Sequence, residues 1–300
     1  MAFKRVLLFG AGGQLGSAFR ETWSGPGALI AADRSRADLD MPGAAAALIA
    51  AEQPDAVINA AAYTAVDRAE SEPERALQVN AAAVREIAEA CAARDIPLLH
   101  FSSDYVFNGK KSGPYVESDA PDPLSAYGRS KLAGEQAAAL CPKHLILRTS
   151  WVFGPHGGNF MRSILRLAGE RDTLDVVDDQ IGAPTATALL VAVGTEALRQ
   201  MQDAPASDPR WGLYHLSAHG EVSWYGFARW ILENAGARAP LRLQPDAVRA
   251  IASADYPSAA RRPHNSRLDC TKFETAFQYP LPDWQTAAGP VLARLQPPAS

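Results

Sequence analysis

Tyr127 and Lys131, on one predicted helix, have the types and spacing needed to move a proton to or from a ketone or an alcohol. Residues four apart share a helix face, so the ammonium of Lys131 can sit beneath the phenol of Tyr127 and favour its ionised form. Ser103 follows the apolar run at residues 97–101 and can hold a carbonyl oxygen against that phenol. Together the three side chains predict ketone reduction or alcohol oxidation.

These residues need support from the rest of the chain. A Tyr-x-x-x-Lys pair arises from composition alone in about one chain in six. Ser103 is equally compatible with a turn cap. The prediction therefore depends on whether the surrounding elements can bring a cofactor and a substrate to this helix.

A glycine-rich turn follows the first predicted strand, residues 4–9, and precedes a predicted helix at residues 17–23. Gly10, Gly13 and Gly16 permit a tight turn, close approach of the backbone to a ligand, and close packing of helix on strand. The N-terminus of a helix also points free N–H groups at an anion. The turn therefore predicts a site for the pyrophosphate of a dinucleotide.

The second predicted strand, residues 28–33, ends in a carboxylate where the ribose of a dinucleotide is bound. Asp33 at this place favours NAD, because it can accept a hydrogen bond from the ribose 2′-OH. Arg34 and Arg36 follow directly, and an arginine there can pair with the 2′-phosphate of NADP. The preference between NADH and NADPH therefore stays open. Residues 38–40 either cap the next helix or border the adenine.

Strands and helices alternate along the first half of the chain. Apolar runs at residues 55–59, 97–101 and 144–150 predict further parallel strands, and residues 73–95 predict a long helix. Small residues at 60–62 let a cofactor lie against the backbone at a strand end. The alternation predicts an α/β fold with a Rossmann-like, doubly wound parallel sheet and right-handed crossovers.

The second half predicts a smaller lobe that closes over a substrate. We expect an NAD(P)-binding domain at residues 1–155, which residues about 185–218 rejoin, and a mainly substrate-binding lobe at residues 156–300. Thr185 is a candidate N-cap for a helix that runs to Met201.

Two single residues near the predicted ligand edge have alternative roles. Trp151, just beyond the fifth strand, is as compatible with a core position as with stacking on a sugar or a base. His100, inside an apolar strand, fits a satisfied core histidine better than a catalyst.

The bulk composition excludes several classes of protein. A net charge of −4 without a basic stripe argues against nucleic acid as a partner. No apolar run approaches the roughly 18 residues of a membrane span, and the N-terminus reads as a strand rather than a leader. We expect a cytoplasmic protein. The three cysteines, Cys91, Cys141 and Cys270, are far apart and read as reduced thiols.

Several motifs in the same order resemble one known family. The glycine-rich turn, residues 101–107, Tyr127-Gly128-Arg129-Ser130-Lys131 and Arg148-Thr149-Ser150-Trp151 are similar to the extended short-chain dehydrogenases/reductases. The blocks at residues 59–67, 69–74, 131–135, 179–185 and 262–268 resemble more closely the dTDP-4-dehydrorhamnose reductases within that family. The resemblance covers nearly the whole chain.

The resemblance implies NADPH- or NADH-dependent reduction of the 4-keto group of a dTDP-6-deoxyhexose, to give dTDP-L-rhamnose for polysaccharide synthesis. It places Tyr127 and Lys131 at the nicotinamide ribose. By the same matching it places Ser103, Asp104 and Trp151 at the sugar nucleotide, with residues 180–185 and Arg262 beside its nucleotide end. The residues that it places in the cofactor site are Gly13, Gln14, Leu15, Asp33, Asp38, Leu39, Ala62, Tyr63 and Thr64.

The sequence departs from this family at two places. Ser103 stands where threonine is common, which keeps the hydroxyl. Some members bind magnesium between two subunits through glutamates, but residues 186–190 and 289–294 here carry no carboxylate. We therefore expect no metal and a monomer.

Two other functions remain open from the sequence. One is a nucleotide-sugar epimerase or dehydratase of the same fold, although only Asp104 is acidic in the Ser103-Asp104-Tyr105 segment. The other is a non-catalytic NADP-binding regulatory subunit, against which the complete hydroxyl, phenol and ammonium set argues.

Overall fold

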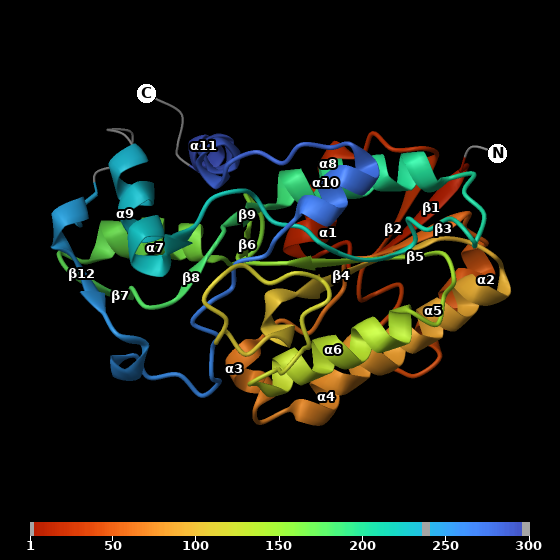
Figure 1. Ribbon diagram of the computed structural model, residues 1–300, viewed down its shortest axis with the longest axis horizontal. Helices are drawn as coiled ribbons and strands as arrows, with labels where there is room; N and C mark the ends of the chain where they lie inside the picture. Colours follow the sequence, from red (N-terminus) through yellow and green to blue (C-terminus); the bar gives the residue numbers. More distant parts are fainter. Residues whose placement is uncertain (1–2, 236–240, 296–300) are drawn as a thin grey trace.

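The computed structural model describes residues 3–235 and 241–295. A six-stranded parallel sheet lies at its centre, with the strand order β2-β1-β3-β4-β5-β10 (Figure 1). The strands are β1 (Arg5–Phe9), β2 (Ala28–Ala32), β3 (Ala56–Asn59), β4 (Leu98–Ser103), β5 (His144–Thr149) and β10 (Gly212–His215). Strands β3 and β4 are wholly buried, as expected where helices cover both faces of a parallel sheet. The predicted doubly wound sheet is confirmed.

Helices cover the two faces of the sheet in two layers (Figure 1). One layer contains α1 (Gln14–Thr22), α8 (Thr187–Met201) and α10 (Thr271–Phe277). The other contains α2 (Ala44–Glu52), α4 (Pro73–Leu77), α5 (Ala83–Ala93) and α6 (Ala126–Ala138), with α3 (Val66–Ala69) near its end. Each layer packs its own hydrophobic cluster against the sheet. Because neighbouring strands are parallel, the carboxyl ends of β1, β3 and β4 meet at one edge of the sheet.

The expected helix at residues 73–95 is interrupted, so this prediction was partly wrong. A π-helical turn, η1 (Gln78–Ala82), separates α4 from α5. The buried Asn80 lies in this turn and bonds the backbone of Tyr63 and the hydroxyl of Ser130. These contacts with residues distant in the sequence explain the π-helical turn at this position. Such turns are frequent at functional sites.

The remaining elements form a lobe beside the carboxyl edge of the sheet (Figure 1). Its helices are α7 (Phe160–Glu170), α9 (Trp224–Asn234) and α11 (Trp284–Leu295), and its short helical turns include η4 (Pro245–Ala247) and η5 (Ser253–Asp255). Its strands pair as β6 (Val152–Phe153) with β9 (Thr185–Ala186), β7 (Leu174–Val177) with β12 (Val248–Ile251), and β8 (Ile181–Gly182) with β11 (Val222–Ser223). Aromatic side chains of α7, α9 and α11 pack together inside it.

Thr185 does not cap α8, contrary to expectation. It lies in β9, and its hydroxyl donates to the carbonyl of Ala183 at 3.1 Å. Ala186 occupies the cap position without a side-chain bond. The pairing of β9 with β6 moves the start of the helix one residue later than expected.

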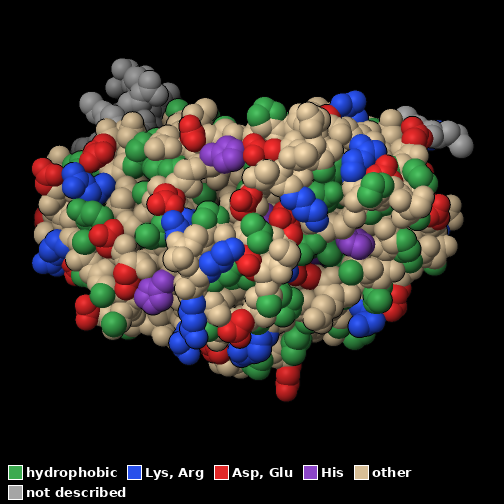
Figure 2. Space-filling model, viewed as in Figure 1, with side chains coloured by type: hydrophobic (Ala, Val, Ile, Leu, Met, Phe, Trp, Pro, Cys, Tyr) green, Lys and Arg blue, Asp and Glu red, His purple; other side chains and the backbone are tan. Residues whose placement is uncertain are grey.

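Charged side chains of both signs are interspersed over the face seen in Figure 2. Within residues 3–235 and 241–295, no helix combines the length and apolar character needed to cross a bilayer.

Candidate active site

A cavity of about 910 Å³ runs along the carboxyl edge of the sheet, from the glycine-rich turn to α6. It contains all but one of the residues predicted to bind the cofactor. The predicted residues that line it are Gly10, Gly13, Gln14, Leu15, Asp33, Asp38, Leu39, Ala62, Tyr63, Thr64, Tyr127 and Lys131. Residues that sequence reasoning did not single out also line it, among them Arg68, Arg75, Val79, Ser102, Thr149, Val152, Gly157 and Leu190.

The glycine-rich turn is shaped by close backbone contacts. Gly10 has a φ of +80°, and a Cβ there would lie 2.5 Å from the backbone nitrogen of Ala61, so only glycine fits. Gly16, the one predicted residue outside the lining, packs α1 onto the turn, because its Cβ would overlap the carbonyl of Gly10. The first residues of α1, Gln14 and Leu15, then border the cavity. Free N–H groups at this helix end suit a pyrophosphate.

The two arginines after β2 point in different directions. Asp33 accepts hydrogen bonds from the backbone N–H and the hydroxyl of Ser35, which lower the pKa of its carboxyl. Arg34 lines the cavity. Arg36 donates to the carbonyl of Ala31 at 3.0 Å and pairs with Glu52. Of the two candidates for a 2′-phosphate, the geometry leaves Arg34.

Asn80 fixes the loop after β3. The sequence indicates a backbone hydrogen bond for this residue but not its partner. Its side-chain oxygen accepts from the N–H of Tyr63 at 2.8 Å, and its side-chain nitrogen donates to the carbonyl of Tyr63 at 3.1 Å. The same nitrogen donates to the hydroxyl of Ser130 on α6 at 2.9 Å. A buried amide in the middle of an amphipathic helix was the available signal. Asn80 thus connects the cavity wall to the helix that carries Tyr127.

The side chains of Ser103 and Tyr127 lie close together where β4 meets α6, near enough for the serine hydroxyl to lower the pKa of the phenol. Ser103 ends β4, and its hydroxyl donates to Asp104 at 2.9 Å. Ser125 caps α6 by accepting from the N–H of Gly128, so the helix begins at Ala126, one residue before Tyr127. The predicted hydroxyl and phenol are therefore adjacent.

The pKa of Tyr127 does not follow the sequence expectation. Burial raises it to about 12, the bond from Ser103 lowers it, and the charge of Asp104 raises it. The ammonium of Lys131 is buried and donates to the carbonyl of Phe101 at 2.7 Å. The expectation that Lys131 lowers the pKa of the phenol is therefore wrong for this structure, because desolvation outweighs other influences. Burial also lowers the pKa of Lys131 to about 8, an effect that Glu135 opposes.

Asp104 and Arg262 lie next to the pair, on the side of the lobe. Burial raises the pKa of Asp104 to about 6, against hydrogen bonds that include Ser266 and Ser103. Arg262 pairs with Asp67 at 2.8 Å and bonds Tyr105. Ser103, Asp104 and Trp151, the three predicted substrate residues, do not line the cavity, although Ser103 and Asp104 lie beside Tyr127.

Trp151 belongs to the aromatic packing of the lobe. It stacks on Trp224 with ring centroids 3.5 Å apart and an angle of 8° between the rings. Gly182 lies against it, since a Cβ there would be 2.7 Å from the indole. Trp151 also has a φ of +48°, unusual for a bulky residue. Trp151 is half-buried and lies outside the hydrophobic core clusters, so the core alternative is not confirmed and its substrate role is a proposal.

A buried ion pair lies below the site. Arg148 donates to Glu135 through two bonds, at 2.8 and 2.7 Å, and Ser102 donates to the same carboxylate at 2.6 Å. Because Glu135 is one turn after Lys131 on α6, the pair ties the catalytic helix to β4 and β5.

Only one of the two ring nitrogens of His100 has a hydrogen-bond partner among the described residues. One ring nitrogen lies 3.1 Å from the amide of Asn59, whereas Nε2 is buried without a hydrogen-bond partner among the described residues. Burial lowers its pKa well below the usual range. His100 is thus a neutral core residue. No group of three or more His, Cys, Asp or Glu suited to a metal occurs in the described part of the chain.

Comparison with known proteins identifies the family. The family model described as the RmlD substrate binding domain matches residues 4–296. The chain is 43% identical over 295 residues to dTDP-4-dehydrorhamnose reductase of Escherichia coli (strain K12), covering 97% of each, and 39% identical over 297 residues to that of Mycobacterium tuberculosis, covering 97% of this chain and 93% of the relative.

Solved structures agree with this result. The dTDP-4-dehydrorhamnose reductase of Bacillus anthracis in complex with NADP superposes with a TM-score of 0.87 at 31% identity, covering 97% of this chain and 99% of that one. DesIV of Streptomyces venezuelae, a dTDP-glucose 4,6-dehydratase solved with NAD, has a TM-score of 0.74 over 97% and 96% of the two chains, but at 18% identity it shares the fold alone. The resemblance drawn from the motifs is confirmed, and the chain belongs to the RmlD substrate binding domain family.

Proposed function

We propose that this protein reduces the 4-keto group of dTDP-4-dehydro-6-deoxy-L-mannose (dTDP-4-dehydrorhamnose) with NADPH or NADH, giving dTDP-L-rhamnose. The observation that carries the proposal is Tyr127, with Ser103 close by, at the end of a cavity that begins at a glycine-rich turn. The names of the relatives supply the substrate class.

The residues present fit a dinucleotide. Gly10 and Gly13 line the cavity beside the start of α1, where a pyrophosphate would meet free N–H groups, and a side chain at Gly10 would collide with Ala61. Asp33 stands where a ribose hydroxyl is bound in this kind of fold. The cavity then continues to Tyr127 and Lys131, which we assign to the nicotinamide ribose.

A reduced nicotinamide, when bound, supplies the hydride. Tyr127 enters the reaction protonated, since its pKa of about 12 lies well above neutral pH. Its phenol donates a proton to the ketone oxygen, while the hydroxyl of Ser103 holds that oxygen in place and stabilises the phenolate that is left. Lys131 supplies positive charge beneath this phenolate in its ammonium form.

We assign the sugar nucleotide to the opening between the Tyr127 end and the lobe. Asp104 and Trp151 flank this opening, and residues 180–185 and Arg262 extend it toward the nucleotide. The short strand pairing of β6 with β9 joins these segments directly to the carboxyl edge of the sheet.

The test is to incubate purified protein with the 4-keto sugar nucleotide and either NADH or NADPH. One reduced nicotinamide consumed per product supports a reductase. An epimerase or a dehydratase recycles its cofactor and gives no net consumption, and a regulatory subunit gives no product. Tyr127→Phe should lower turnover by about 10²- to 10⁴-fold, the usual contribution of a general acid, and near-normal turnover would contradict the assignment.

We further propose the division of the chain and its assembly. Residues 1–155 with about 185–218 form the dinucleotide domain, since β10 extends its sheet, and the rest of 156–300 mainly forms the substrate lobe. Residues 186–190 and 289–294 lack carboxylates for a shared metal, which favours a monomer. Light scattering with and without a chelator measures this. We place the reaction in the cytoplasm, where nucleotide sugars and NAD(P)H are made.

A further inference from the structure

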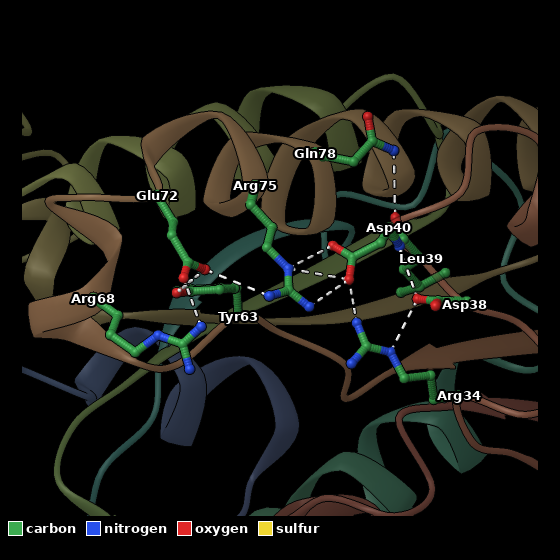
Figure 3. Close-up of polar contacts among 9 residues, drawn as sticks. All are labelled: Arg34, Asp38, Leu39, Asp40, Tyr63, Arg68, Glu72, Arg75 and Gln78. Atoms are coloured by element: carbon green, nitrogen blue, oxygen red, sulfur yellow. Dashed lines mark hydrogen bonds and ion pairs between the residues drawn. The ribbon is translucent and has the colours of Figure 1, made fainter.

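Arg34 lies just after β2 and lines the cavity, and two of its three side-chain nitrogens already donate to carboxylates. Its Nε donates to Asp38 at 3.1 Å, and one terminal nitrogen pairs with Asp40 (Figure 3). Its side chain is 63% exposed, so solvent and ligands can reach it. We call Arg34, Asp38, Asp40 and Arg75 the carboxylate clasp.

Asp40 is held from its other side. Arg75, on α4, donates to both oxygens of Asp40, at distances from 2.8 to 3.2 Å (Figure 3). Arg75 in turn pairs with Glu72 at 3.4 Å, and Glu72 accepts from the phenol of Tyr63 at 2.8 Å. The side chain of Asp40 is only 21% exposed. The carboxylate is therefore anchored to α4 and cannot simply follow Arg34 if that residue turns to a ligand.

This arrangement bears on the difference between NADH and NADPH. In this kind of fold a carboxylate after β2 binds the ribose 2′-OH, and an arginine nearby accommodates a 2′-phosphate. A phosphate monoester carries about −1.5 to −2 charge at neutral pH and needs charge-assisted hydrogen bonds from such an arginine. Arg36 is turned to Glu52, which leaves Arg34 for that role. A 2′-phosphate must then compete with Asp40 for a terminal nitrogen of the Arg34 guanidinium. The negative charge of Asp40 also repels the phosphate.

We propose that Asp40 is a specificity-determining residue, which lowers the affinity for the 2′-phosphorylated cofactor by holding Arg34. The inference rests on the proposed function, since it needs a dinucleotide in this cavity. It does not depend on which sugar is reduced. Glu72 and Tyr63 support the clasp by fixing Arg75.

The test measures dissociation constants of NADPH and NADH by isothermal titration calorimetry, without a sugar substrate. Asp40→Asn keeps the size of the side chain and removes its charge. It should lower the ratio of the NADPH constant to the NADH constant about tenfold, which corresponds to about 1.4 kcal/mol. Adenosine 2′,5′-bisphosphate, a probe for the 2′-phosphate alone, should bind more tightly to the variant by a similar factor.

Two further variants separate the clasp from a general charge effect. Adding Arg34→Gln to Asp40→Asn should abolish the gain, because the phosphate then lacks its arginine. Glu89→Gln removes one carboxylate from an exposed pair with Arg85 on α5, outside the cavity, so it should leave the ratio unchanged. Thermal unfolding of each variant confirms that it is folded.

The outcomes are distinct. An unchanged ratio in a folded Asp40→Asn variant overturns the inference, as does an equal shift in Glu89→Gln, or a gain that persists without Arg34. If the wild-type protein binds neither NADH nor NADPH, the proposed function fails and the clasp with it. If both bind and only the variant ratio is unmoved, the clasp alone fails.

Discussion

Adding one methyl group to α6 by the substitution Gly134→Ala should lower both stability and catalytic activity. Gly134 lies one turn beyond Lys131, and its ideal Cβ would overlap the carbonyl oxygen of Asn80, far inside the 3.0 Å that real Cβ contacts keep. The obstacle is backbone of the π-turn, 3.3 Å away at the carbonyl carbon, and not a flexible side chain. In Gly134→Ala the helix and the turn must therefore separate by roughly 1 Å.

Separating α6 from the π-turn should affect both the stability and the activity of the protein. Overpacking of this kind destabilises by about 1–3 kcal/mol. At about 2–4 °C per kcal/mol, the unfolding temperature should fall by several degrees. The shift also moves Tyr127 and Lys131 relative to Ser103, and a misplacement of about 1 Å can lower the rate about 10²-fold. We expect kcat to fall by that order.

Gly169→Ala is the matched control. Gly169 also lies in a helix, α7, and its Cβ would meet no atom within 4 Å. The same substitution there should stabilise by about 0.5–1 kcal/mol through helix propensity, and turnover should be unchanged. Calorimetric unfolding and steady-state ketone reduction measure both. A Gly134→Ala protein as stable and as active as Gly169→Ala would refute the argument.

Two further predictions concern buried charge. Lys131→Met should abolish activity yet raise the free energy of unfolding at pH 7 by up to about 3 kcal/mol, since the native pKa of about 8 lies below the usual lysine value of 10.5. Wild-type stability should rise with pH between these two values, and urea titrations of the variant should lack this rise; an unchanged pH dependence would contradict burial as the cause. Glu135→Gln should cost about 3–5 kcal/mol by stranding Arg148, whereas Arg166→Gln, which breaks an exposed pair with Glu170, should cost under about 1 kcal/mol in the same denaturation assay.

The sheet and the position of the site follow from local patterns. Apolar runs of four to six residues alternate with amphipathic segments, and parallel strands then place their carboxyl ends together. That is why Asp33, Ser103 and the glycine-rich turn could be assigned to one edge before any contact was known. Nothing in this step requires knowledge of partners distant in the sequence.

The π-turn shows where such reasoning stops. Residues 73–95 have the composition of a continuous helix, with proline at its start. The partners of Asn80 are 17 and 50 residues away in the sequence, so local propensity carries no information about them. The same limit applies to Arg34 and Arg36, whose directions are set by Asp40 and Glu52.

Burial decides the charge states that spacing leaves open. The spacing of Tyr127 and Lys131 places both on one face of α6, but it does not say how much water reaches them. In the structure, burial removes water from both groups. It raises the pKa of the phenol to about 12 and lowers that of the ammonium to about 8. Each shift favours the neutral form. A ketone reductase needs a protonated phenol before hydride transfer, and burial keeps Tyr127 in this form. The positive charge of Lys131 then stabilises the phenolate that forms after the proton has been donated.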